Sequence, residues 1–332
     1  MGTQAQSPST ATPGGVASSR RPTPALQSGP LDRHVTSIRP QAGWQLINAR
    51  ELWLYRELAG ILAWRDLKVR YKQTFLGVAW AVLQPAMMMV VFTIVFDRMA
   101  RISAGDVPYP LFSYAGLLPW TFFATAVGTA GNSVVGSERL VTKIYFPRLI
   151  VPFAAVGAAA VDFLVAFGLH LALMLYYGVA PGAGMLLAPL IFLPIALTAL
   201  GVGTLLAALN VSYRDFRYVI PFLLQLWMFA TPSIYMATPA APAAVTAEAP
   251  APAVERGDRP IPTPTAERRE IGSRSLLALN PMIALVASFR AATIGGPMPW
   301  AGLGTASIYS VVVLLVGCLY FRSVEDSLAD VI

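Results

Sequence analysis

The chain has 332 residues, of which 56% are hydrophobic and 12% charged, and its formal net charge is +7. A soluble domain carries about a quarter of its residues as charged ones. This composition therefore excludes a soluble domain and indicates a protein with several membrane spans. The positive charge does not indicate nucleic-acid binding, because membrane proteins concentrate Lys and Arg in their cytoplasmic segments. The single Cys318 excludes a disulfide framework.

Residues 1–44 are rich in Ser, Thr, Pro, Gly and Ala and have too little apolar content to fold alone. We predict a disordered cytoplasmic tail. A secretory signal is not expected, because no apolar stretch follows its few arginines before the helix near residue 50.

Residues 50–64 have the layout of an amphipathic helix. Apolar side chains share one helical face, Arg56 lies opposite, and aromatic residues flank them: Leu54, Leu58, Ile61 and Leu62, with Trp53, Tyr55 and Trp64. This layout is typical of a helix in the membrane interface. An ordinary juxtamembrane linker is the alternative interpretation.

A basic block then meets a long apolar run. The block contains Arg65, Lys68, Arg70 and Lys72 against a single Asp66, whereas the 23 residues of 74–96 contain no charge. An uncharged run of this length predicts a membrane-spanning helix, and neighbouring helices in a bundle tolerate a proline such as Pro85.

Similar runs recur, and together they predict six spans and an all-α integral membrane protein over residues 45–325. The expected spans are 74–96, 111–131, 149–177, 185–209, 219–237 and 302–321. Sixteen of the 24 Lys and Arg residues lie in segments that are cytoplasmic if the N-terminus is inside. The positive-inside rule therefore favours both termini in the cytoplasm, including the tail 326–332, with the basic block anchoring the first span.

Asp162 and His170 are polar residues within the third expected span, eight positions apart and so roughly on one helical face. One interpretation is a proton relay. The other is a buried Asp that hydrogen-bonds to a neighbouring helix, which the separation of about 12 Å along the helix axis favours.

Two short loops between spans carry charges on the expected cytoplasmic side. Residues 132–152 predict a short helix that stops at Pro147, and residues 210–221 contain a compact polar cluster. The charged and polar members are Glu138, Arg139 and Lys143 in the first loop, and Tyr213, Arg214, Asp215 and Arg217 in the second. Ordinary positive-inside loops are the alternative interpretation.

The stretch 239–275 is rich in Pro and Ala and predicts a flexible extracytoplasmic insert. The apolar residues after it are interrupted by Pro281, Arg290 and a Gly-Gly-Pro sequence. Because a charge at the bilayer centre costs roughly 2.5–3.5 kcal/mol on insertion scales, we expect a re-entrant or interfacial helical hairpin on the outer face, not a seventh span.

No catalytic constellation is visible in the sequence. It contains no phosphate-binding loop of the form G-x-x-x-x-G-K-[ST], no H-E-x-x-H and no paired cysteines, and its two histidines, His34 and His170, lie far apart. We therefore expect no enzyme activity, metal or cofactor in this chain, and an energy source in another chain.

Several blocks taken together resemble the permease subunit of bacterial ABC exporters for O-antigen and other lipid-linked polysaccharides, a type-2 ABC export family. They are "RDLKVRYKQTFLGVAWAVLQP", "YPLFSYAGLLPWTFFATAV", "LVTKIYFPRLIVP", "NVSYRDFRYVIPFLLQLWMFATPSIY" and "LNPMIALVASFRAATIG". The resemblance covers roughly residues 45–322, and the tail 1–44 and the insert 239–275 fall outside it.

The resemblance implies a homodimer in the bacterial inner membrane, paired with two copies of a separate subunit that binds ATP and Mg²⁺. It implies an interface helix matching residues 50–64 and two cytoplasmic coupling helices matching about 134–145 and 211–218. Two short outer-leaflet helices would match about 276–297. The implied substrate is a glycan linked to a polyprenyl diphosphate.

Three sets of candidate site residues follow. Contacts with the ATP-binding subunit are expected from Glu138, Arg139, Lys143, Tyr213, Arg214 and Asp215. The basic residues Arg65, Lys68, Arg70 and Lys72 are candidates for binding the diphosphate, with anionic membrane phospholipid as the alternative ligand. Aromatic rings stack on sugars, so glycan guidance is a hypothesis for Trp80, Trp120, Phe122, Phe123, Tyr145, Phe146 and Trp227, each of which has a packing or lipid-facing role as its alternative.

Three other functions compete with glycan export. One is a permease of similar architecture for a smaller amphiphile, such as a drug or a simple lipid. A second is a proton-coupled secondary transporter that uses Asp162, although the inverted repeats expected of that class are not visible. A third is a membrane scaffold without transport activity.

Overall fold

The computed structural model describes residues 49–72, 77, 79–99, 107–144, 146–231 and 280–325. Within these ranges every regular element is a helix, which confirms the expected all-α class. The elements are α1 Ala49–Leu54, α2 Arg56–Tyr71, α3 Ala79–Phe92, the π-helix η1 Thr93–Met99, α4 Tyr109–Gly136, α5 Glu138–Lys143, α6 Ile150–Tyr176, the 3₁₀ helix η2 Ala183–Leu187, α7 Ala188–Ser212, α8 Phe216–Phe229, α10 Pro281–Ile294 and α11 Trp300–Glu325.

Five stretches in the described part of the chain are long and apolar enough to cross a membrane. They are Ala79–Asp97, Tyr109–Gly136, Ile150–Tyr176, Ala183–Ser212 and Trp300–Glu325. Each corresponds to one of the six expected spans. The remaining one, expected at 219–237, coincides with α8, which has 14 residues, while residues 232–237 lie outside the described ranges.

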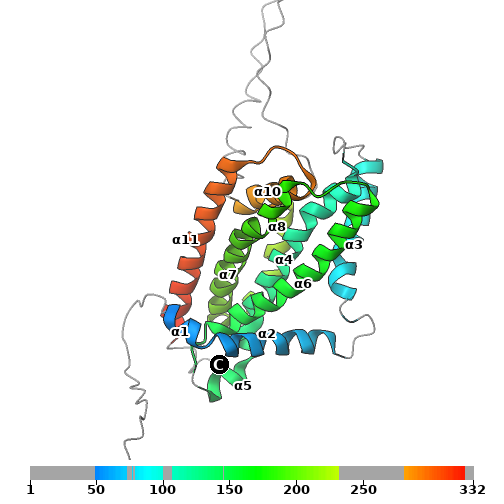
Figure 1. Ribbon diagram of the computed structural model, residues 1–332. Helices are drawn as coiled ribbons and strands as arrows, with labels where there is room; N and C mark the ends of the chain where they lie inside the picture. Colours follow the sequence, from blue (N-terminus) through cyan, green and yellow to red (C-terminus); the bar gives the residue numbers. More distant parts are fainter. Residues whose placement is uncertain are drawn as a thin grey trace, which may run out of the picture. The chain divides into compact units, whose positions relative to one another are not determined.

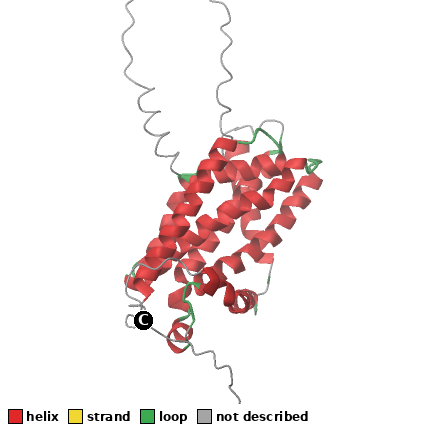
Figure 2. Ribbon diagram, turned by 60° about the vertical axis from the view of Figure 1, so that its left-hand side comes forward, coloured by secondary structure: helices red, strands yellow, loops and turns green. Residues whose placement is uncertain are grey.

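The long helices run side by side (Figures 1 and 2). Helix α7 lies between α4 and α11, and α6 lies on the other side of α4 (Figure 1). Helix α2 crosses one end of this bundle and packs on α6, and α5 lies at that same end (Figure 1). Helix α10 lies at the opposite end, against α4 and α11. The bundle therefore has two different ends, one formed by α2 and α5 and the other by α10.

Helices α7 and α11 approach each other at two glycines. A Cβ atom placed on Gly201 would lie 2.5 Å from the backbone nitrogen of Leu314, so only glycine fits there. Gly317 faces Gly201 across the same contact, and Thr198 Oγ1 donates a hydrogen bond to Ser310 Oγ at 2.8 Å. Small residues and hydroxyl hydrogen bonds are the usual means of helix association in membranes, where lipid removes most of the hydrophobic driving force.

Helix α10 contains Arg290, the charged residue that made a seventh span unexpected, and the structure shows how this charge is accommodated. Arg290 is buried, its Nε donates to the carbonyl oxygen of Phe112 at 3.2 Å, and its guanidinium carbon lies 3.7 Å from the centre of the Phe112 ring. A hydrogen bond and a cation–π contact both offset the desolvation of the cation. Of the hairpin expected at 276–297, residues 280–297 are described, and they contain one continuous helix, α10, so the hairpin itself stays a prediction.

Asn280 joins the end of α8 to the start of α10. Its Nδ2 donates to the carbonyl oxygen of Ala230 at 3.0 Å and to Thr231 Oγ1 at 2.9 Å. Its Oδ1 accepts from Trp227 Nε1 and from the backbone nitrogen of Met282, each at 3.0 Å. The end of α8 and the start of α10, which precede and follow residues 232–279, are therefore held next to each other.

We expect Asn280→Ala to lower the free energy of unfolding by about 2–3 kcal/mol, because it removes a helix N-cap and leaves the Trp227 indole without its acceptor. Asn280→Asp keeps the acceptor and loses both donors, so its loss should be intermediate. The apparent Tm in detergent, followed by fluorescence-detected size exclusion, measures both. Equal melting temperatures for wild type and Asn280→Ala would show that Asn280 does not stabilise the contact between α8 and α10.

Candidate functional site

The basic block predicted in front of the first span belongs to α2. The interface helix expected at 50–64 is divided at Tyr55 into α1 and α2, and α2 continues past residue 64 to Tyr71 because no proline interrupts it. It buries Leu62 and leaves Ile61 and Trp64 exposed, as expected for a helix with one face on the bundle and another toward the membrane surface. Lys68 and Arg70 lie in its last turn, where cations interact favourably with the helix dipole.

Arg70 and Tyr71 hold the carboxylate of Asp162 on α6. The guanidinium of Arg70 forms an ion pair with Asp162 Oδ2, and Tyr71 Oη donates to Asp162 Oδ1 at 2.5 Å. Burial, followed by the hydrogen bond to Asp162, raises the pKa of the Tyr71 phenol to about 12, so the phenol stays a donor at neutral pH. The cluster ties α2 to α6.

His170 does not share this cluster. Its ring is fully buried, stacks on Tyr114 with a centroid distance of 6.0 Å, and contacts Phe167. Neither ring nitrogen has a hydrogen-bond partner in the described part of the chain. The geometry supports the interpretation of Asp162 as a hydrogen-bonded structural residue and shows no chain of donors from Asp162 to His170.

The other three basic candidates of α2 and its C-cap differ in what surrounds them. Arg65 donates to Asp66 at 2.8 Å and to Ser137 Oγ at 3.4 Å, and Ser137 is the residue that joins α4 to α5. Lys68 and Lys72 are exposed and form no ion pair within the described ranges. These two lysines are therefore the members of the set most available to an external anion.

Helix α5 presents its charges outward from an anchored base. Glu138, Arg139 and Lys143 are exposed, whereas Val141 is buried in a hydrophobic cluster to which α2 and α11 also contribute. Beyond α5, the backbone nitrogen of Arg148 donates to Glu325 Oε1 at 3.1 Å, and its guanidinium binds the Glu325 carbonyl oxygen. The residues on either side of α5 therefore connect it to α2, through Ser137, and to the end of α11, through Arg148.

The second charged loop is a turn rather than the separate helix expected at about 211–218. Helix α7 ends at Ser212 and α8 begins at Phe216, so Tyr213, Arg214 and Asp215 form the connection between them. All three are exposed. The first expected coupling helix is likewise shorter than 134–145, because α4 continues to Gly136 and only Glu138–Lys143 forms α5.

Asn210 connects α7 to α4 near the two charged loops, and it was not identified as a site residue from the sequence. It is buried near the end of α7, and its Nδ2 donates to the carbonyl oxygen of Gly131 at 2.9 Å and to Asn132 Oδ1 at 3.1 Å. The only signal in the sequence is an amide residue at the end of a long apolar run, which gives no partner. The contact holds the ends of α4 and α7 together.

A cavity of about 310 Å³ lies beside the Arg70–Asp162 pair, between α2, α3, α4 and α6. Apart from that pair and Tyr71, its polar lining comes from Gln84 and from three threonines of α4, and its aromatic lining comes from α3, α4 and α6. The lining residues of both kinds are Gln84, Thr121, Thr125, Thr129, Trp80, Phe122 and Phe163.

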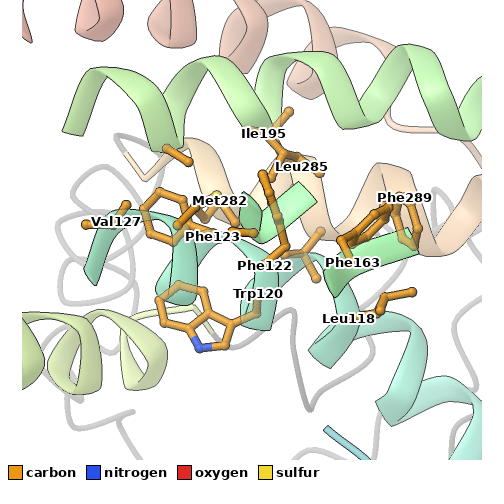
Figure 3. Packing of buried hydrophobic residues seen from close by; sticks show 14 of the residues in the cluster. Leu118, Trp120, Phe122, Phe123, Val127, Phe163, Ile195, Met282, Leu285 and Phe289 are labelled. Carbon is orange, nitrogen blue, oxygen red and sulfur yellow. The ribbon is translucent and has the colours of Figure 1, made fainter. Parts of the chain in front are cut away.

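Most of the proposed glycan-guiding aromatics pack within the subunit. Trp120, Phe122 and Phe123 are buried in the core between α4 and its neighbours (Figure 3), and Phe123 meets Trp227 edge to face at 5.0 Å. Phe146 is buried with the base of α5, and Tyr145 lies outside the described residues. Trp80 is 48% exposed, at the cavity.

The fold and this site define a helical, multi-pass membrane protein with charged, exposed loop residues at one end and, among the described residues, no cluster of metal ligands. The sequence matches the ABC-2 type transporter family over residues 57–242, more than half of its length. The chain belongs to this family of ABC transporter membrane proteins.

Named relatives extend the match. The chain is 32% identical over 283 residues, 85% of its length and 97% of the relative's, to the O-antigen export system permease protein RfbA of Myxococcus xanthus. It is 26% identical to RfbA of Klebsiella pneumoniae over 54% of its own length and 69% of that protein's. It is 23% identical to the polysialic acid transport protein KpsM of Escherichia coli, over 48% of its own length and 63% of that protein's.

Proposed function

We propose that this chain is the permease subunit of an ABC transporter that exports a lipid-linked polysaccharide across the cytoplasmic membrane. The observation that carries the proposal is the similarity to an O-antigen export permease along 97% of that relative. In this proposal six spans cross the membrane with both termini inside, two copies form the export path, and two copies of a separate ATP-binding subunit supply the energy.

The geometry at the α5 end of the bundle supports the coupling role. Exposed charges on α5 and on the turn after α7 form the contact with the ATP-binding subunit, and closure of that subunit on ATP moves both. Asn210 makes the two loops move as one unit, and the contacts of Ser137 and Arg148 pass the displacement to α2 and α11. The spans thereby open a path along the dimer axis.

The basic residues of α2 and its C-cap have separate roles in this proposal. Lys68 and Lys72, which are exposed, attract the diphosphate of the lipid carrier. Arg70 positions α2 through its ion pair with Asp162 on α6, and Arg65 positions it through the hydrogen bond to Ser137. An anionic phospholipid competes for the same lysines. Trp80, which is exposed in the single subunit, and Trp227, which is half-buried there, are the aromatic candidates for contact with glycan.

Reversing one charge on α5 tests the coupling. We expect Arg139→Glu to reduce glycan export at least roughly tenfold while the complex still hydrolyses ATP, because the docking contact loses a charge pair that is worth a few kcal/mol when it is desolvated. Surface glycan is measured on intact cells with a carbohydrate stain, and phosphate release is measured on the purified complex.

The matched control is Arg50→Glu, which makes the same charge change at an exposed position of α1. It should export normally. Normal export by Arg139→Glu at wild-type abundance would remove α5 from the coupling role.

A further inference from the structure

The cavity beside α2 has a lining that is polar but carries no net charge. Among the described residues that line it, only Arg70 and Asp162 are charged at neutral pH, and they pair with each other. Tyr71 adds a phenol that stays protonated at neutral pH. An anionic phosphate would have to displace Asp162 from Arg70 and then lie next to that carboxylate, so the cavity itself disfavours an anion.

Hydroxyl groups line one wall in a row. Thr121, Thr125 and Thr129 are four residues apart on α4 and therefore share one face of the helix. Thr129 Oγ1 is satisfied within its own helix by the carbonyl oxygen of Thr125 at 2.7 Å. The hydroxyls of Thr121 and Thr125 form no hydrogen bond to any other described residue, and both side chains are half-buried.

The opposite wall combines an amide with an aromatic face. Gln84 and Trp80 are four residues apart on α3, and both are exposed at the edge of the cavity. The negative face of an indole attracts polarised C–H groups, and an amide both donates and accepts hydrogen bonds. Phe122 and Phe163 close the apolar part of the cavity.

This combination matches one chemical class. A sugar ring presents C–H groups on its faces and hydroxyls on its edge, and it has no charge. Two available threonine hydroxyls, an amide, a carboxylate–guanidinium pair and an indole complement those groups. The volume of about 310 Å³ is at the lower end of the range for small-molecule sites, so the cavity holds a small headgroup and not a long glycan.

We infer that this cavity binds the sugar of the lipid-linked substrate nearest to its diphosphate, through Thr121, Thr125, Gln84 and Trp80. The inference rests on the proposed export function and deepens it. The diphosphate remains with Lys68 and Lys72 on α2, and the neutral cavity reads the first sugar. Recognition of the carrier and recognition of the sugar are thus separate.

Binding of paired probes to the full chain in lipid nanodiscs tests this inference. The sugar-bearing probes are farnesyl diphosphate carrying one glucose, galactose or N-acetylglucosamine, and the sugar-free probe is farnesyl diphosphate. At least one sugar-bearing probe should bind more tightly than the sugar-free one. The double variant Thr121→Val, Thr125→Val should weaken that probe about tenfold, because two hydroxyl hydrogen bonds are lost, and leave the sugar-free probe unchanged.

Three controls make the result specific. Thr305→Val removes an exposed hydroxyl that bonds within α11 and should change neither affinity. Lys68→Gln with Lys72→Gln should weaken both probes equally. Trp80→Leu gives an independent variant and should weaken only the sugar-bearing probe.

Equal affinity of the wild type for all probes would overturn the inference, as would equal weakening of both probe types by the threonine variant. A further probe is monoglucosyl diacylglycerol, a membrane glycolipid without a diphosphate. If the double threonine variant weakened the binding of this probe alone, the cavity would be assigned to a membrane glycolipid and the inference would be overturned. If the wild type still exports glycan with its ATP-binding partner in these cases, the proposed function stands without the cavity.

Discussion

Gly317→Ala is expected to abolish the folded bundle or to reduce its yield severely. The new Cβ would lie 2.7 Å from Thr204 Oγ1 and much closer to the Gly201 carbonyl oxygen than the sum of their van der Waals radii, and that oxygen belongs to the backbone and cannot rotate away. Overpacking in a dense core typically costs about 1–3 kcal/mol, and this contact lies between two long helices that would have to separate along their length.

The measurement is the fraction of monodisperse protein and its apparent Tm in detergent. Gly304→Ala is the matched control on the same helix, because nothing lies within 4 Å of a Cβ at that position. It should be neutral or slightly stabilising, since alanine favours a helix over glycine by about 0.8–1 kcal/mol. Equal stability of the two variants would show that α7 and α11 do not pack as described.

Asp162→Ala is expected to destabilise the protein by about 2–3 kcal/mol, below the roughly 3–5 kcal/mol seen for fully buried pairs because Arg70 remains partly exposed. The variant leaves the Arg70 guanidinium without its carboxylate partner and removes the acceptor of the Tyr71 phenol. Thermal melting in detergent follows the loss.

A double-mutant cycle separates the ion pair from local packing. In Arg70→Met with Asp162→Leu, both charges are absent, and much of the stability lost in either single variant should return. Asp162→Asn retains a hydrogen-bond acceptor for Tyr71 and should preserve transport. Loss of transport in a stable Asp162→Asn protein would instead support proton coupling.

The position of the long helices could be predicted from the sequence because each is an uninterrupted apolar run. Residues 111–131 and 149–177 agree with α4 and α6 to within a few residues at most ends, and α4 extends further only where polar residues continue the helix to Gly136. The sequence could not show where α8 ends. The apolar run continues to residue 237, but the helix stops at Phe229, where Asn280 binds the following carbonyl oxygen.

The partners in the candidate site could not be predicted. Arg70 and Asp162 are separated by 92 positions, and nothing in either segment indicates the other. The two loops carry visible charges, but nothing in the sequence indicates that Asn210 joins α4 and α7, the helices that precede them. Composition shows which residues are charged, whereas tertiary packing determines which of them remain available.

The aromatic residues illustrate the same limit. Trp80 and Phe123 look alike in the sequence, since each is an aromatic residue within an apolar run. In the structure Phe123 is fully buried, whereas Trp80 is 48% exposed at a cavity. Periodicity is uninformative here because membrane helices are apolar on every face, so it does not separate core from cavity.

Reconstitution with and without the ATP-binding subunit tests the central claim most directly. Proteoliposomes containing the permease, its ATP-binding partner and a lipid-linked glycan should move that glycan across the bilayer only when ATP is hydrolysed. Movement of the glycan at the same rate by the permease alone would contradict the account, as would ATP hydrolysis by the full complex without any movement of glycan.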